Sequence, residues 1–284
     1  MAVSGLSQHA GRWFVLKIGG ELAAEPQRLA DGVGRAVAAF VAEGIKVAVV
    51  HGAGPQASEL TQKLGLKKTM VGGRRVTDAA TLEVMKMTLA GQVSVDVAAA
   101  FRRVGVQALC TTGVSAGLVE ATRRPPVVVS GGGPEPVDFG LVGDVASVNV
   151  ALFERLFAAG VVPVLGSLSG DAGGQVFNIN ADTVATRVAS SLKAAKLFLV
   201  SNVPGVLANK DDPKTRIPTL TPKAARENIA SGVIQGGMIP KVEESLLMLE
   251  EGIDAIHIVG IDPTSAILEE AQEPGRAGTA FVRG

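Results

Sequence analysis

The chain contains little that would support disulfide, metal or nucleic-acid chemistry. Its 284 residues include one cysteine, Cys110, which excludes an internal disulfide and predicts a buried, inert thiol in a reducing compartment. The three histidines, at positions 9, 51 and 257, lie far apart without the spacing of metal ligands, so we expect no metal-binding residues. Lys and Arg number 27, as do Asp and Glu. This balance gives no indication of a nucleic-acid partner.

Membrane-spanning and phosphate-loop signatures are also missing from the sequence. The first residues lack the basic start and apolar core of a signal peptide, and no stretch approaches the ~20 apolar residues that cross a bilayer. We therefore expect a soluble, cytoplasmic protein without a membrane partner. No Gly-Lys pair occurs in the chain, which excludes the Gly-Lys-Ser/Thr loop of P-loop proteins.

The main pattern that is present is an alternation of two kinds of segment. Apolar runs of strand length alternate with segments of helical period: WFVLKI, QRLADGVGRAVAAFVAEG, KVAVVHG and PQASELTQKLG, and again after residue 160. Such alternation predicts β-α-β units and a parallel sheet, which is an α/β fold. The short β-rich pieces between LVEATRRP and PVVVSGGGPEP predict hairpins over the sheet edge rather than a separate domain.

The longest predicted helix covers residues 77–104. Apolar residues recur along it at steps of three and four, so one side must be buried. They are Leu82, Met85, Leu89, Val93, Val97, Phe101 and Val104. The opposite side carries Ala90 and Gly91, small residues that would let another helix approach closely. A subunit contact and ordinary core packing both fit this side.

Two lysines occupy positions where a cation is unexpected. Lys17 interrupts an apolar strand just before Gly19-Gly20, so its ammonium would lie at the carboxyl edge of the sheet, where open α/β folds bind ligands. The alternative is a surface lysine on an edge strand. Lys241 falls in the first turn of a helix, where positive charge opposes the helix dipole. An anion docked on the preceding glycine amides would favour that position, and a solvated lysine fits it equally well.

Three further polar residues are candidates for the same site. Asp182, in NINADTVATRVA, is the acid best placed at the sheet edge to hold two lysines around a phosphate, although a first-turn acid capped by Asn180 is the ordinary alternative. Arg75, in a loop before the long helix, could grip a carboxylate with its planar guanidinium or remain solvated. Asn178 could satisfy a turn or bind a substrate amide or carboxylate.

The stretch VVHGAGPQA, residues 49–57, matches the strand, glycine turn and helix of a dinucleotide-binding fingerprint. In that fold the fingerprint follows the first strand, whereas here it follows the second. The next acidic residues, Glu59 and Asp78, do not end a second strand as a ribose-binding acid should. We therefore interpret the loop as a cradle for an anion other than NAD.

Eight segments in order resemble the amino-acid kinase family and, within it, the N-acetylglutamate kinases: VLKIGGEL, VVHGAGPQ, GGRRVTDAATLEVMKMTLAG, DFGLVGDVASVN, FNINADTVA, SNVPGVL, GGMIPKVEESL and GTAFVR. The match covers nearly the whole chain. It implies a three-layer αβα fold with a mainly parallel central sheet in two lobes. Residues 1–180 would bind the amino-acid substrate and form a dimer, and residues 181–284 would bind ATP.

The resemblance also implies a reaction, in which the γ-phosphoryl of MgATP is transferred to the side-chain carboxylate of N-acetyl-L-glutamate in arginine biosynthesis. Mg²⁺ would be held mainly by the nucleotide phosphates. By resemblance Lys17 and Lys241 stabilise the transition state and Asp182 orients both. Such a reaction needs positioning and charge neutralisation but no covalent nucleophile on the protein.

The remaining site residues are assigned by resemblance as well. Ala53 and Gly54 would offer main-chain groups to the substrate, Arg75 would pair with its α-carboxylate, and Asn178 would bind its amide region. The residues expected to line ATP are Gly19, Gly20, Asn202, Val203, Gly205, Val206, Gly236 and Gly237.

Two positions depart from the family pattern. Ala53 replaces the middle one of three glycines, and its methyl restricts the backbone conformations open to the loop. Ser201-Asn202 stands where an aspartate is usual, and the form SNVPG resembles relatives that phosphorylate an aminoadipate or glutamate carried on a small protein. That substrate is the alternative within the enzyme class. A catalytically silent nucleotide or amino-acid sensor is the alternative from another class, although binding alone would not require both lysines and Asp182.

The assembly is also predicted by resemblance. Arginine-inhibited members carry a long N-terminal helix that links dimers into a hexamer, and only sixteen residues precede Lys17 in this sequence. We therefore expect a homodimer, formed through the helix at residues 77–104, that arginine does not inhibit.

Overall fold

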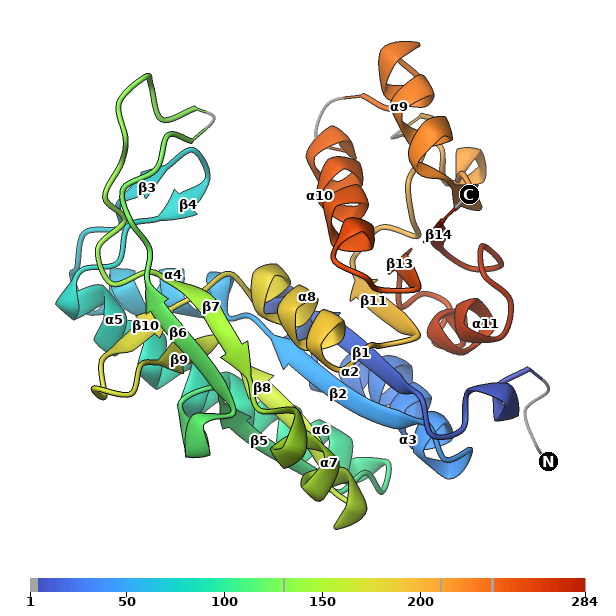
Figure 1. Cartoon of the computed structure of the whole chain (residues 1–284), viewed down its shortest axis with the longest axis horizontal. Helices are drawn as coiled ribbons and strands as arrows, with labels where there is room; N and C mark the ends of the chain where they lie inside the picture. The colour runs from blue at the N-terminus through green and yellow to red at the C-terminus, as the bar shows by residue number, and fades with distance from the viewer. Residues whose placement is uncertain (1–4, 130, 210, 236–237, 284) are drawn as a thin grey trace.

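The computed structural model describes residues 5–129, 131–209, 211–235 and 238–283. Its centre is an eight-stranded sheet in which every neighbouring pair is parallel except β13 and β14 (Figure 1). In spatial order the strands are β12 (Thr219–Leu220), β14 (Thr279–Val282), β13 (Ala255–Val259), β11 (Lys196–Val200), β1 (Trp13–Ile18), β2 (Lys46–His51), β8 (Val162–Gly166) and β5 (Ala108–Thr112). The predicted α/β class with a mainly parallel sheet is confirmed.

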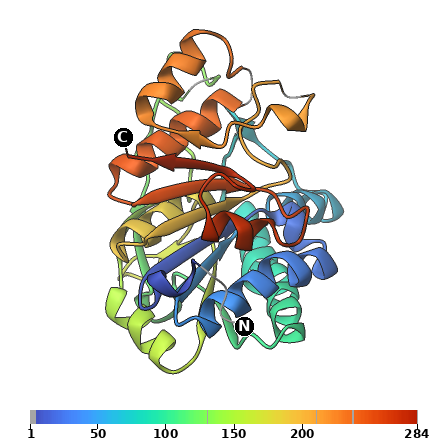
Figure 2. The ribbon, with the colours of Figure 1, turned by 90° about the vertical axis from the view of Figure 1, so that its right-hand side faces the viewer.

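Helices cover both faces of this sheet, as Figure 2 shows from the side. One face carries α1 (Gly20–Ala23), α2 (Pro26–Leu29), η2 (Ala30–Gly34), α3 (Arg35–Ala42), α4 (Gly54–Lys63), α5 (Ala79–Lys86), η3 (Met87–Val93), α6 (Ser94–Arg103) and α11 (Ala266–Gln272). The other carries α7 (Val150–Ala158), α8 (Ala181–Ser191), α9 (Pro222–Ala230) and α10 (Met238–Glu250). Short 3-10 turns are η1 (Ser7–His9), η4 (Ser115–Gly117) and η5 (Pro213–Thr215). The three-layer αβα arrangement is confirmed.

The central strand β1 shows why two cores form. Successive side chains of a strand point to opposite faces, so Phe14 and Leu16 enter the core under α3 and α6, while Trp13 and Val15 enter the core under α8 and α10. All four are buried. A strand that is apolar on both sides can only lie inside such a sandwich, which explains the continuous apolar run WFVL.

A second, smaller sheet lies over the face that carries α8. Its order is β10 (Val176–Asn178), β9 (Leu168–Gly170), β6 (Val119–Arg123) and β7 (Gly143–Val148). The hairpin of β3 (Met70–Val71) and β4 (Arg74–Arg75) packs against the loop between β6 and β7 through Val71, Val129 and Phe139. The predicted hairpins over the sheet edge are thus present, and part of them forms a sheet of its own.

The long helix predicted at residues 77–104 is a continuous helical run with an irregular centre. It consists of α5, the π-helical segment η3 and α6. Six of the seven residues of the predicted stripe, Leu82, Met85, Leu89, Val93, Val97 and Phe101, are buried, and the seventh, Val104, is partly buried. The π-helical turns were not predicted, since a change from a four- to a five-residue hydrogen bond leaves little trace in the apolar spacing.

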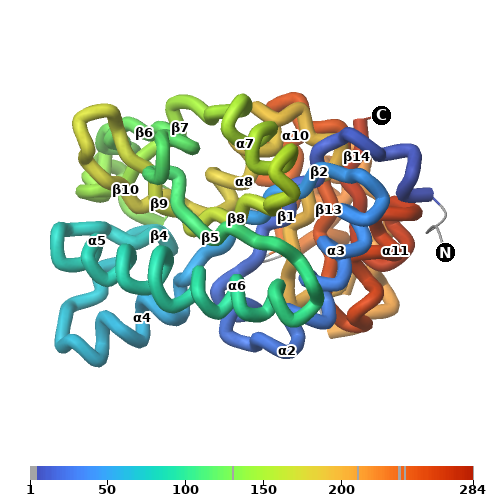
Figure 3. Tube along the Cα trace, turned by 90° about the horizontal axis from the view of Figure 1, so that it is seen from below, coloured from blue at the N-terminus to red at the C-terminus, as the bar shows by residue number. Residues whose placement is uncertain are grey.

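By length and composition the run Ala79–Arg103 is long and apolar enough to cross a membrane, contrary to our expectation from the sequence. Half of the window that meets this test is buried inside the protein. Figure 3 shows the run passing beneath β5 and β8, whose residues it contacts. The core helix of a soluble protein passes the same test, so the finding is weak evidence for a membrane span.

Several elements were missed in the sequence. The edge strand β5 contains Cys110, which is partly buried and whose thiol pKa is raised to about 12 by burial, so it stays protonated. Between β11 and α10 lie η5, β12 and α9, and between β13 and β14 lies α11, none of which the sequence predicted. These elements are short, and short segments carry too few residues for a period to be recognised.

A buried polar cluster holds the end of the chain against β13. Glu270 on α11 accepts hydrogen bonds from Nδ1 of His257 at 2.7 Å and from the amides of Gly275, Ala277 and Gly278 at 2.8, 3.0 and 2.7 Å. Burial lowers the pKa of His257, so its ring is neutral at pH 7. Burial by itself would raise the pKa of Glu270, but these hydrogen bonds outweigh it, and the pKa lies below its usual value.

We expect Glu270→Gln to lower the free energy of unfolding by about 2 to 4 kcal/mol, because an amide cannot accept from the ring and all three backbone donors. The folded-state pKa of Glu270 is depressed. Its contribution is therefore complete above about pH 4.3, the pKa of a glutamate in an unfolded chain, and disappears as the pH falls through the lower folded-state value. Chemical denaturation at pH 7 and at decreasing pH measures both effects.

The matched control is Glu269→Gln. Glu269 neighbours Glu270 on α11, but its carboxylate is 36% exposed and lies 3.8 Å from Arg276. Equal destabilisation by the two variants would contradict the assignment of the stabilising role to the buried carboxylate.

Candidate active site

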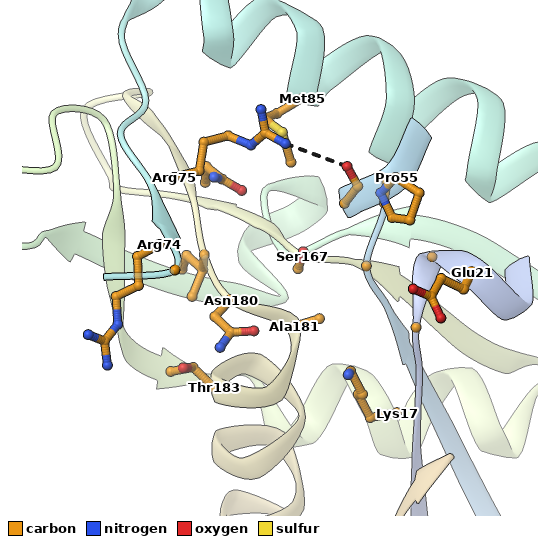
Figure 4. A pocket seen from close by; sticks show the side chains of 18 of the residues that line it. Lys17, Glu21, Pro55, Arg74, Arg75, Met85, Ser167, Asn180, Ala181 and Thr183 are labelled. Atoms are coloured by element: carbon orange, nitrogen blue, oxygen red, sulfur yellow. Dashed lines mark hydrogen bonds between the residues drawn. The ribbon is translucent and has the colours of Figure 1, made fainter. Parts of the chain in front are cut away.

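A cavity of about 720 Å³ opens at the carboxyl ends of four adjacent strands, β11, β1, β2 and β8. The residue that follows each strand lines it: Ser201, Gly19, Gly52 and Ser167. Figure 4 shows part of the lining from close by. This is the edge of the sheet at which the sequence predicted a site, and it is where open α/β folds bind ligands.

Two helices begin at the walls of this cavity. The first turn of α4 contributes Gly54 and Pro55, and the first turn of α8 contributes Ala181 and Thr183. Asn180 caps α8 by accepting a hydrogen bond from the amide of Asp182 at 3.1 Å, as the sequence predicted. Helix N-termini carry unsatisfied amides and a partial positive charge, so the walls favour an anionic ligand.

Lys17 lies on the central strand of the sheet and extends into the cavity (Figure 4). Because β1 pairs with both β2 and β11, the alternative of a surface lysine on an edge strand is wrong. Its Nζ lies 3.0 Å from Oδ1 of Asp182, and the two side chains are only 19% and 28% exposed. The carboxylate of Asp182 therefore compensates a largely desolvated ammonium and fixes its position.

Lys241 reaches the cavity from the other side. It lies in the first turn of α10, and its Nζ donates to Oγ of Ser201 at 3.5 Å. Asp182, which we expected to orient both lysines, forms its ion pair with Lys17. The two preceding glycines expected to bind ATP, Gly236 and Gly237, lie outside the described residues.

Arg75 lies in the strand β4 rather than in the loop expected from the sequence. Its Nη2 donates to Oγ of Ser58 at 2.9 Å and to the carbonyl of Gly54 at 3.5 Å, so it points toward the loop before Pro55 (Figure 4). Its Nη1 is buried and has no hydrogen-bond partner among the residues that the structure describes. A buried guanidinium with a free donor beside a cavity can bind a carboxylate.

Asn178 is the last residue of β10 and, like Arg75, lines the cavity. Its side-chain amide donates to Oγ1 of Thr77 at 3.1 Å. Because that bond uses one N–H, the other N–H and the amide oxygen of Asn178 can face a ligand.

The loop around Ala53 is built for close approach of two chain segments. Ala53 precedes α4 with φ of −144°, which any L-residue adopts, so its methyl introduces no backbone strain there. A Cβ on Gly20 would lie 3.1 Å from Cα of Ala53 and 2.9 Å from Cδ of Pro55. Gly20 therefore allows the loop after β1 to touch the loop after β2, and both line the cavity.

The segment after β11 is divided between the cavity and the core. Asn202 and Val203 line the cavity, and the side-chain Nδ2 of Asn202 donates to the carboxylate of Glu21 on α1. Gly205 and Val206, also expected to bind ATP, are buried, and the amide of Val206 donates to Oγ1 of Thr279 at 2.9 Å. Gly19 and Gly20 line the cavity.

Several lining residues were not predicted. Arg74, Arg124, Ser201 and Glu244 belong to this group. The cavity wall raises the pKa of Glu244 mainly through burial and next through the charge of Asp182, against the opposing effect of three nearby cations. Glu244 follows Lys241 by three residues on one helix face, and this spacing was the available signal. Arg74 adjoins Arg75, so the sequence carries no separate signal for it.

Carboxylates and histidines able to hold a metal do not gather at the cavity. Within residues 5–129, 131–209, 211–235 and 238–283, no group of three or more His, Cys, Asp or Glu side chains is arranged to bind a metal ion. A divalent cation at this site would need ligands from its substrate.

The geometry defines an α/β protein with a cavity between two lysines that suits an anion, as in proteins that transfer phosphoryl groups by charge neutralisation and positioning. The sequence profile of the Amino acid kinase family matches residues 12–260. The chain belongs to the amino acid kinase family. Membership of this family implies ATP as the phosphoryl donor.

Curated relatives are similar over almost the full chain. Acetylglutamate kinase of Sorangium cellulosum (strain So ce56) is 48% identical over 269 residues, which cover 95% of this chain and 94% of that protein. Acetylglutamate kinase of Myxococcus xanthus (strain DK1622) is 40% identical over 284 residues, with 98% and 91% covered.

Solved structures share the fold. N-acetylglutamate synthase from Neisseria gonorrhoeae, complexed with coenzyme A and N-acetyl-glutamate, superposes with a TM-score of 0.79 at 22% identity over 98% of this chain. This chain spans 61% of the length of that synthase chain. Carbamate kinase from Giardia lamblia bound to AMP-PNP gives a TM-score of 0.66 at 14% identity, with 97% and 100% covered. At these identities the likeness concerns the fold alone.

Lys17→Ala and Lys241→Ala are each expected to lower phosphoryl transfer by a factor on the order of a hundred or more, because each removes a positive charge from the cavity. Both variants should fold, since both lysine side chains line the cavity rather than a packed apolar core. An assay of ADP release together with thermal unfolding measures the two properties. Lys223→Ala, which changes a lysine on α9 that is 86% exposed, is the control. Full turnover by either cavity variant would exclude that lysine from the transfer step.

Proposed function

We propose that this chain transfers the γ-phosphoryl group of ATP to the side-chain carboxylate of N-acetyl-L-glutamate, giving N-acetyl-L-glutamyl 5-phosphate in arginine biosynthesis. The observation that carries the proposal is the cavity flanked by Lys17 and Lys241, with Lys17 held by Asp182 at 3.0 Å. Supporting it, two acetylglutamate kinases are 48% and 40% identical to this chain over nearly its whole length. A biosynthetic enzyme of this kind fits a cytoplasmic location.

The acceptor would be bound on the side of the cavity formed by β2, β4 and β10. The free Nη1 of Arg75 would pair with the α-carboxylate of the acceptor, and Asn178 would bind its amide region. Main-chain groups of Ala53 and Gly54 at the start of α4 would hold the reacting carboxylate. These contacts would fix the acceptor without a covalent bond to the protein, so its side-chain oxygen can meet the phosphoryl group in line.

The donor would be bound on the side formed by β1, β11 and α10. Gly19, Gly20, Asn202 and Val203 line this side. Gly236 and Gly237 complete the proposed nucleotide-binding set, whereas Gly205 and Val206 are buried and the Val206 amide is bonded to Thr279. When bound, MgATP supplies the phosphoryl group and a divalent cation held mainly by the phosphate oxygens. Asp182 would orient the lysines while they neutralise the charge that spreads over the transferred group.

The two sides of the cavity suggest two lobes. Residues 1–180 contribute β1, β2, β8 and β5 to the sheet, and residues 181–284 contribute β11, β13, β14 and β12. We assign acceptor binding to the first lobe and ATP binding to the second. The cavity lies where β1 of the first lobe pairs with β11 of the second.

Hydroxylamine trapping of the acyl phosphate, coupled to an assay of ADP release, tests the proposed function. N-acetyl-L-glutamate is compared with free glutamate, free aspartate and N-acetyl-aminoadipate, with and without arginine. We expect hydroxamate from N-acetyl-L-glutamate and no inhibition by arginine. Absence of turnover on any free amino acid, despite ATP binding, would replace this function by phosphorylation of a carrier-bound aminoadipate or glutamate, or by a silent sensor.

We further propose that the enzyme is a homodimer, formed through the helical run Ala79–Arg103. Apolar and small side chains on its outer side face away from the core. Met87 is 49% and Val95 65% exposed, and Ala90 and Gly91 lie between them. A Cβ on Gly91 would meet no atom within 4 Å, so this surface leaves room for a second helix.

Val95→Glu is expected to shift the protein from dimer toward the 29.0 kDa monomer, because the interface would have to bury a carboxylate. Analytical ultracentrifugation over a range of protein concentrations measures the change. Leu247→Glu is the control, since Leu247 is 62% exposed on α10. A wild-type monomer, or a dimer that both variants leave intact, would refute this interface.

A further inference from the structure

His51 is a buried titratable group that the proposed reaction does not use. It is the last residue of β2 and stands directly before the loop of Gly52, Ala53 and Gly54. Its side chain is fully buried, and its Nε2 lies 3.2 Å from Oγ of Ser94, the first residue of α6. A side chain on the strand that leads into the cavity is therefore bonded to a helix that lies outside it.

The direction of this hydrogen bond follows from the serine. The hydroxyl of Ser94 donates its one proton to the carbonyl of Leu89 at 2.7 Å, so its oxygen accepts from Nε2–H of His51. Burial lowers the pKa of His51 to about 4, so the ring is neutral at pH 7 and keeps this proton on Nε2. Across the part of the chain that the structure describes, Nδ1 of His51 has no hydrogen-bond partner of ordinary geometry, and the nearby backbone of Gly52 raises the pKa against the larger effect of burial.

The carbonyl of Leu89 belongs to the π-helical segment η3. The bond from Ser94 spans five residues, the spacing of a π-helix, and so fastens the segment at the point where it turns into α6. The chain of bonds from His51 through Ser94 to Leu89 thus joins the end of β2 to the middle of the long helical run.

A third element meets this junction. Gly166, the last residue of β8, pairs with His51 across the sheet. A Cβ on Gly166 would lie 3.0 Å from the carbonyl of Leu89 and 3.2 Å from Cε1 of His51. Gly166 therefore allows the carboxyl ends of β2 and β8 to pack directly against η3. This close packing leaves the His51 ring little room to move.

The fixed ring is close in sequence to the groups proposed to bind the acceptor. The amide of Gly52 donates to the carbonyl of Ile18 at 3.2 Å, and the amide of Ala57 donates to the carbonyl of Ala53 at 2.8 Å. Between these two bonds the backbone passes the cavity. The position of its amides therefore depends on where the end of β2 is held, because only Gly52 separates His51 from Ala53.

We propose that His51, through its hydrogen bond to Ser94, is a positioning residue for the acceptor-binding loop of Gly52, Ala53 and Gly54. The proposal rests on the proposed function in one respect, the assignment of the acceptor to this loop. Ser94 and the carbonyl of Leu89 would hold His51, and through it the loop, in the binding geometry from outside the cavity.

Thr88 provides a matched comparison within the same helical run. It is fully buried, and its hydroxyl donates to the carbonyls of Val84 and Met85 at 2.8 and 3.2 Å. Ser94 likewise donates to a carbonyl of its own helix but in addition accepts from His51. Ser94→Ala and Thr88→Val each remove one buried hydroxyl, and only the first breaks the link to the loop.

Amide hydrogen exchange tests the positioning without any assumption about the substrate. In Ser94→Ala and His51→Leu we expect the amides of Gly52 and Ala57 to exchange at least about tenfold faster than in the wild type, because the loop opens locally more often. His51→Gln, whose side-chain N–H can replace Nε2–H as donor to Ser94, should restore slow exchange. Thr88→Val should leave these two amides unchanged even if it lowers the melting temperature.

Steady-state kinetics then connect the loop to the acceptor. Ser94→Ala should raise KM for N-acetyl-L-glutamate by roughly tenfold to a hundredfold and leave KM for ATP unchanged, since the displaced amides face one substrate only. A change that merely reduced the amount of folded enzyme would lower the rate equally for both substrates and would not split the two constants.

The outcomes separate the two proposals. Unchanged exchange at Gly52 and Ala57 in Ser94→Ala would overturn the positioning role, whatever the enzyme phosphorylates. A second outcome is faster exchange in Ser94→Ala together with no hydroxamate from N-acetyl-L-glutamate in the wild type. It would support the positioning role and refute the proposed function. Faster exchange with both KM values unchanged would remove the acceptor from this loop. If His51→Leu does not fold, Ser94→Ala by itself decides each of these points.

Discussion

The ion pair between Lys17 and Asp182 is the constraint on which the architecture of the site depends. A lysine at the end of a strand that is covered on both faces costs free energy unless a carboxylate meets it. Asp182 does so at 3.0 Å from the first turn of α8, a helix that packs across β1, β2 and β11. The pair thus ties the first turn of α8 to the end of β1 and holds the Lys17 ammonium at the cavity wall.

The other features of the cavity depend on backbone segments that lie close to the Lys17 ammonium. Gly20 lets the loop after β1 lie against Ala53 and Pro55, which sets the first turn of α4 beside Lys17. Lys241 approaches from α10 and donates to Ser201 at the end of β11. Two cations and two helix N-termini converge there, and among the described residues no group of three or more His, Cys, Asp or Glu side chains could hold a metal ion. Such a surface attracts a polyanion and can neutralise charge that moves between donor and acceptor.

Residues outside the cavity wall also support its acceptor side. His51 and Gly166 end the neighbouring strands β2 and β8 and pack closely against the π-helical segment at Leu89. This packing restricts the end of β2, from which the proposed acceptor-binding loop begins. The same helical run exposes Met87 and Val95 on its outer side. One helical run therefore lies between the proposed dimer surface and the loop that would bind the acceptor. Its π-helical segment contains both the exposed Met87 and the carbonyl of Leu89 that Ser94 binds.

The sequence by itself determined the layers, because continuous apolar runs of strand length that alternate with segments of helical period can be satisfied only by a parallel sheet with helices on both faces. It also marked Lys17, Asp182 and Arg75, since a charge next to apolar strands or glycine turns is costly without a partner. Only the tertiary structure decided that Asp182 pairs with Lys17, that Ser201 meets Lys241, and that Glu244 and Arg74 line the same cavity. The short elements β5, β12 and α11 were likewise decided there. The reason is physical: local periods report which face of a segment is buried, whereas contacts between residues far apart in the chain depend on how the packed layers bring them together.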